Sequence, residues 1–127
     1  MSTNDNQLQN QNYLNIETFR INGLGVKTPV WFVMDNQVIY VRTVENSGKI
    51  KRIRNSNKVQ VAPCKMDGTP LGSWIPARAK EIKDPETDKY VDNLLGKKYG
   101  FQKKLFAWMS RRRGDRYTVL KIELSSN

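Results

Sequence analysis

Hydrophobic and polar residues alternate along much of the chain after residue 12, a pattern that is typical of β-strands. The turn-forming stretches 22–25 and 35–36 interrupt it, and Asn and Gly there tolerate the positive φ of tight hairpins. The pattern predicts six strands, over residues 13–19, 26–34, 38–43, 59–64, 74–82 and 116–124. Short strands in this order are typical of a small antiparallel barrel.

Three segments have helical spacing instead. A short helix is predicted over residues 49–54, with Ser47 at the position of its N-cap. A longer helix is predicted from Asp84 and Pro85 to Gly96. A second apolar stripe follows at Phe101, Leu105, Trp108 and Met109. The predicted fold class is therefore mainly β with flanking helices.

The first twelve residues have a different composition from the rest. They contain seven Asn or Gln and one apolar residue beyond Met1, too little to offset the entropy of ordering a backbone. The sequence therefore predicts a disordered tail over residues 1–12 and one domain over 13–127. It contains neither a signal-peptide pattern nor an apolar run long enough for a membrane span, so a cytoplasmic protein with no membrane partner is expected.

The charge and the missing residue types narrow the possible functions. The chain has 22 Lys and Arg against 12 Asp and Glu, a net charge of +10, which favours an anionic partner. It has no His, which excludes imidazole bases and His metal ligands. Cys64 is the single cysteine, and we expect a small buried hydrophobe there. No metal site and no catalytic side chain are predicted.

The basic residues are concentrated around the short predicted helix. Five occur in ten residues with no acid, at Lys49, Lys51, Arg52, Arg54 and Lys58. If Ser47 caps this helix, the N–H groups of residues 48–50 are unpaired, and Lys49 and Arg52 share a face. This arrangement could hold a phosphate. The alternative interpretation is a solvated helix face, as charge runs usually are.

Several motifs in a fixed order carry a family resemblance. They are Thr-Pro-Val-Trp-Phe at 28–32, Ile-Tyr-Val-Arg-Thr at 39–43, Ser-Gly-Lys-Ile-Lys-Arg-Ile-Arg at 47–54, the strand 59–64, and then Gly72, Trp74 and Lys-Tyr-Gly at 98–100. Together they span about residues 13–124. The sequence resembles the flavin and deazaflavin split-barrel superfamily of pyridoxamine 5′-phosphate oxidase, in particular its branch of F420-dependent enzymes.

The resemblance implies a six-stranded antiparallel split β-barrel that forms a homodimer, with two grooves between the subunits for FMN or coenzyme F420. It places the cofactor phosphate at Thr43, Ser47, Gly48 and Lys49, with Arg52 on the same helical face. It places the ring along Thr28, Pro29, Val30 and Trp31. We expect Trp74 to reach the groove of the partner subunit.

The function implied is an oxidoreductase that passes hydride from F420 or FMN to a small organic acceptor, because the cofactor carries the chemistry. Two alternatives stay open. One is a non-catalytic carrier of a flavin or tetrapyrrole on the same fold. The other is a basic small barrel that binds nucleic acid, which is less favoured because the basic residues concentrate on helices and turns rather than on one sheet face.

Overall fold

The computed structural model describes residues 7–100, 102–104 and 116–125. Two helices, α2 (Gly48–Asn55) and α3 (Pro85–Tyr99), accompany a seven-stranded sheet in this part of the chain. The strands are β1 (Tyr13–Phe19), β2 (Gly25–Val30), β3 (Val33–Asp35), β4 (Val38–Val44), β5 (Lys58–Cys64), β6 (Ile75–Ile82) and β7 (Tyr117–Leu124). The prediction of a mainly β protein with flanking helices is confirmed.

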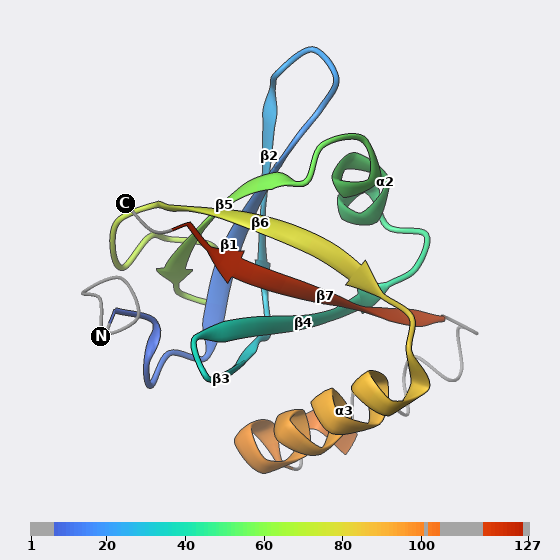
Figure 1. Cartoon of the computed structure of the whole chain (residues 1–127). Helices are drawn as coiled ribbons and strands as arrows, with labels where there is room; N and C mark the ends of the chain where they lie inside the picture. Colours follow the sequence, from blue (N-terminus) through green and yellow to red (C-terminus); the bar gives the residue numbers. More distant parts are fainter. Residues whose placement is uncertain (1–6, 101, 105–115, 126–127) are drawn as a thin grey trace.

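One stretch of chain forms both edges of the sheet. The strand order is β2-β1-β5-β6-β7-β4-β3, so β2 and β3 lie at opposite ends of it, and every pair of neighbours is antiparallel. Only Trp31 and Phe32 separate these two strands along the chain. Two edges joined by two residues must lie near each other, so the sheet curls into a partly closed barrel (Figure 1).

The strand count of six was wrong because the predicted strand 26–34 is broken at this point. The backbone N–H of Phe32 donates to the hydroxyl of Tyr99, and its carbonyl accepts from Lys98, so neither group joins a strand ladder. β2 therefore pairs with β1, and β3 pairs with β4. The hairpin turn after β3 also lies one residue later than predicted, at Asn36 and Gln37, both with positive φ.

The barrel encloses one main core and carries a second, smaller cluster outside. Alternate side chains of the strands point inward, and Ile50 and Ile53 of α2 complete this core. α3 packs on the outer side of the sheet, where Val91, Leu95 and Tyr99 meet Val33 and Val119. Figure 1 shows α2 and α3 at opposite ends of the barrel.

The long helix begins as predicted and ends later. The Asp84 carboxylate accepts a hydrogen bond from the backbone N–H of Thr87, and Pro85 occupies the first turn. The helix passes through Gly96 and ends at Gly100, whose φ is +58°. A glycine inside a helix costs only about 1 kcal/mol, which the contacts of Tyr99 offset. Of the second predicted stripe, Phe101, Leu105, Trp108 and Met109 lie outside the described residues.

Residues 7–12, assigned above to the tail, pack on the barrel. Leu8 is 1% exposed and belongs to the main core. The side-chain amide of Gln7 donates to the carbonyl of Ser73 and accepts from its N–H, at 3.0 and 3.1 Å. One apolar residue is enough to hold this segment because the core offers it a fully enclosed place. Cys64 is buried, as expected.

Candidate functional site

The first turn of α2 carries an unpaired buried hydroxyl. Ser47 has the extended backbone of an N-cap residue, as predicted, but its side chain makes no capping hydrogen bond. Its Oγ is buried and has no hydrogen-bond partner in the described parts of the chain. A buried polar atom without a partner costs free energy, so this position is either a small defect or a place where a ligand completes the bonding.

Three cations lie on or near the helix that follows this hydroxyl. Lys49 and Arg52 follow it on one helical face, and Arg20, at the end of β1, lies near enough to Arg52 to lower its pKa, second to burial. Burial lowers the pKa of Lys49 as well, with a further contribution from Arg52. No carboxylate of the described residues pairs with any of the three. We refer to Ser47, Gly48, Lys49, Arg52 and Arg20 as the α2 cluster.

Two contacts hold the Arg52 guanidinium over the start of the helix. Its Nε donates to Oγ1 of Thr18, a fully buried residue of β1, at 2.6 Å. Its Nη1 lies so close to Gly48 that a Cβ there would be 2.7 Å away. Glycine at position 48 therefore leaves room for the guanidinium beside the unpaired N–H groups of the first turn. Thr18 and Arg20 were missed by the sequence reasoning, although an inward-pointing Thr in the alternation of β1 is a visible signal.

Thr43 is near the α2 cluster along the chain, but no hydrogen bond between described residues joins the two. It lies next to the last residue of β4, 7% exposed, on the inner face with Val41. The backbone then turns, and the N–H of Ser47 donates to the carbonyl of Val44 at 3.1 Å. Its assignment to a phosphate site stays a prediction.

The residues expected along the ring divide between two faces of β2. Thr28 is opposite Ile16 and faces the inner side, whereas Pro29 is opposite Asn15 and faces outward. Val30 packs against the main core. Val26 is opposite Thr18, the partner of Arg52, so Thr28 lies two residues, about 7 Å, along the strand from this contact. The inner face of β2 and the α2 cluster are thus neighbours.

The two tryptophans predicted at the cofactor site, Trp31 and Trp74, lie away from the α2 cluster. Trp31 stacks on Tyr99 of α3, with ring centroids 4.2 Å apart and the planes at 7°. Lys27 Nζ is 5.4 Å from the ring centroid of Trp74, and Lys27 points to the opposite face of β2 from Thr28. Within one chain, the structure does not bring Trp74 to the α2 cluster.

Other kinds of site find no support in this part of the chain. Residues 7–100, 102–104 and 116–125 contain no group of three metal-ligating side chains. Over the same ranges, no helix is both long enough and apolar enough to cross a membrane. The α2 cluster combines three cations, unpaired helix N–H groups and a buried hydroxyl, a donor set that suits a doubly charged phosphate.

Comparison with known proteins finds matches among solved structures only. No family model and no curated protein matches the chain. A pyridoxamine 5′-phosphate oxidase-like protein from Listeria innocua matches with a TM-score of 0.63 and 13% identity, over 95% of this chain and 90% of its own. The chain has the split-barrel fold. This confirms the fold that the motifs indicated.

Two further split barrels differ in what they bind. An F420 reductase matches with a TM-score of 0.59 and 14% identity, over 99% of this chain and 96% of its own. The heme storage protein HutZ from Vibrio cholerae matches with a TM-score of 0.73 and 12% identity, over 96% of this chain and 87% of its own. The split barrel therefore occurs in proteins of different function, and the side chains of the site must distinguish between them.

Proposed function

We propose that this split barrel binds F420 or FMN and is an oxidoreductase that transfers hydride to a small organic acceptor. The observation that carries the proposal is the buried, unpartnered Oγ of Ser47 among three cations that no described carboxylate neutralises. A phosphate at this place would accept from the hydroxyl, from the helix N–H groups and from Lys49 and Arg52.

The proposed contacts of the cofactor ring depend on the position of β2 beside the α2 cluster. With the phosphate at the α2 cluster and Thr43, a tricyclic ring would extend along Thr28, Pro29, Val30 and Trp31. The cofactor, when bound, supplies the hydride chemistry. The residues of the chain anchor the phosphate, fix the ring beside β2 and exclude water on that side. Trp74 would have to come from a second subunit, so we propose a homodimer with the groove between its subunits.

F420 fits the charge of this region better than FMN. F420 adds an acidic glutamate tail, and the candidates to bind it beyond the phosphate are Lys51, Arg54, Arg78 and Lys80. In the structure Arg54 is paired with Glu81 at 3.1 Å, and Arg78 donates to Asn57. Lys51 and Lys80 are exposed and have no carboxylate partner among the described residues, so these two are available for a longer anion.

Titration of the apoprotein with FMN and with F420, followed by cofactor fluorescence, tests the proposal. We expect Lys49→Ala to weaken binding by about 1 to 3 kcal/mol, the range for losing a charge-assisted hydrogen bond. Lys97→Ala is the control, because it removes the same charge from an exposed position on another helix, α3, away from the α2 cluster. Equal effects of the two substitutions would reduce the α2 cluster to a solvated helix face.

A carrier function is the second candidate, favoured by the likeness to HutZ. A heme carrier needs an axial ligand, most often His, and this chain has no His. A flavin carrier would bind the cofactor equally well without turnover. Oxidation of the reduced, bound cofactor by a panel of electrophilic organic acceptors separates the carrier from the enzyme.

A further inference from the structure

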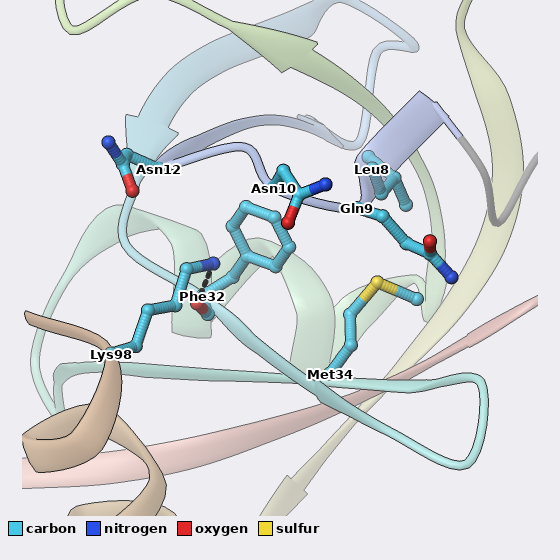
Figure 2. A pocket seen from close by; sticks show the side chains of 7 residues that line it. All are labelled: Leu8, Gln9, Asn10, Asn12, Phe32, Met34 and Lys98. Carbon is cyan, nitrogen blue, oxygen red and sulfur yellow. Dashed lines mark hydrogen bonds between the residues drawn. The ribbon is translucent and has the colours of Figure 1, made fainter.

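A cavity lies apart from the site proposed for the cofactor. Its volume is about 520 Å3, within the range of about 300 to 1,000 Å3 that is usual for small-molecule sites. It is lined by Leu8, Gln9, Asn10, Asn12, Phe32, Met34 and Lys98, and we call it the Lys98 pocket. Figure 2 shows side chains from the N-terminal segment on one side and from the β2–β3 region and α3 on the other.

The Lys98 pocket is separate from the α2 cluster. Asn12 directly precedes β1 and Phe32 follows β2 by two residues, whereas Thr18, which binds Arg52, is near the far end of β1. Six residues of extended chain separate Asn12 from Thr18, which is roughly 20 Å. A ligand here would therefore be distinct from the phosphate of a cofactor bound at α2.

A single cation lies at the wall of this pocket. Lys98 Nζ donates to the carbonyl of Phe32 at 2.8 Å and lies 3.6 Å from the centroid of the Phe32 ring. An ammonium has three donors, so two are left for a ligand. No carboxylate in the described ranges pairs with Lys98, and burial lowers its pKa to about 8.

The other lining groups limit what could neutralise this charge. Phe32 is 1% exposed and belongs to the main core, so the accessible apolar side of the pocket is Met34, and Figure 2 shows Asn10 above the Phe32 ring. The amides of Gln9, Asn10 and Asn12 can donate or accept but carry no charge. One cation matches a singly charged anion, in contrast to the three cations of the α2 cluster, which suit a phosphate. The single charge therefore favours a carboxylate.

We propose that the Lys98 pocket binds a small organic monocarboxylate. Its carboxylate accepts from Lys98 Nζ, its apolar part lies against Met34, and the amides bond its remaining polar edge. Since only the charged lysine binds the anion, affinity falls as the pH rises above about 8, by up to tenfold per pH unit.

Calorimetric titration of the full chain with sodium benzoate and with benzamide at pH 7 tests this site. We expect benzoate to bind at least about tenfold more tightly than its neutral analogue. Lys98→Met should remove this preference, and Lys97→Met, at the neighbouring position of the same helix that does not line the pocket, should keep it. Benzoate affinity should also fall between pH 7.5 and 9.5, the range around the pKa of about 8.

Three results would overturn the proposal. One is no binding of benzoate at millimolar concentration, or no preference over benzamide. Another is an equal loss in the two lysine variants. The third is a loss of benzoate affinity in Lys49→Ala, which would place benzoate at the α2 cluster. The benzoate and benzamide comparison and the pH profile use the unaltered protein, so they decide the matter even if Lys98→Met fails to fold.

Discussion

Ser47 and Asp84 each precede a helix by one residue, and their side chains act differently. The Asp84 carboxylate accepts from both the N–H and the hydroxyl of Thr87, at 3.3 and 3.0 Å, and so caps α3. The Ser47 hydroxyl is buried and accepts nothing from α2. The same type of position therefore stabilises the helix in one case and leaves an unused donor and acceptor in the other.

This difference gives a prediction at the scale of single residues. Asp84→Ala should lower the free energy of unfolding by about 1 kcal/mol, the usual cost of a lost N-cap. Ser47→Ala should leave it unchanged or raise it slightly, because it removes a buried polar atom that has no partner. Urea unfolding of the two variants beside the parent protein measures both. A cost at Ser47 as large as that at Asp84 would contradict the unpaired hydroxyl.

Residue identity and spacing were enough to predict part of the α2 cluster. The position of the helix, its N-cap residue and the shared face of Lys49 and Arg52 all follow from local periodicity. The contact of Arg52 with Thr18 does not, because 34 residues of chain separate the two. The missing capping hydrogen bond of Ser47 could not be predicted either, because tertiary packing around α2 decides whether its hydroxyl reaches the helix N–H groups.

Among the elements, the end of α3 determines where β2 stops and β3 starts. The Tyr99 hydroxyl accepts from the N–H of Phe32 at 3.0 Å and lies 2.8 Å from the carbonyl of Asn12, to which it donates. It thereby joins three segments that are far apart in the sequence. Burial raises the pKa of Tyr99 to about 12 despite its hydrogen bond to Phe32, so the hydroxyl keeps its proton at neutral pH.

Tyr99→Phe should therefore destabilise the protein by about 1 to 3 kcal/mol, because it leaves the buried N–H of Phe32 without an acceptor. Tyr90→Phe on the same helix is the control, since Tyr90 is 39% exposed and the substitution keeps the ring that meets Tyr40 edge to face. The urea midpoints of the two variants give the comparison, provided that their m-values are equal. Equal midpoints would show that water replaces the hydroxyl at no cost.

Local pattern could not reveal this strand break. Residues 26–34 include Val, Trp, Phe and Met in a run that suits a continuous strand, and the sequence therefore predicted one. The groups that interrupt it, Lys98 and Tyr99, come 66 and 67 residues after Phe32. The same contacts stabilise the last residues of α3, beyond Gly96. Both errors thus share one long-range cause.

For the whole molecule, the fold leaves apolar surface at the tip of the β1–β2 hairpin, where Ile21 is 90% exposed and Leu24 is 61% exposed. Figure 1 shows this hairpin projecting beyond the barrel. Together with the position of Trp74, away from the α2 cluster of its own chain, this supports the homodimer proposed above. A cofactor groove completed by a second subunit would use residues that one chain holds apart.

Sedimentation at micromolar concentration should therefore give twice the chain mass of 14.7 kDa. The cofactor should strengthen the association, because a ligand that contacts both subunits binds the dimer better than the monomer. A 14.7 kDa species that still binds one cofactor per chain would contradict the shared groove and the role given to Trp74.

The place of β7 in the sheet affects how the protein is made. β7 follows the other six described strands along the chain, yet it lies between β6 and β4 and pairs with both. Until the ribosome has released residues 117–124, the nascent chain has two separate groups of strands with unpaired edges facing each other. Closure of the barrel therefore has to wait for β7, and a chain truncated before this strand would present both edges and tend to aggregate.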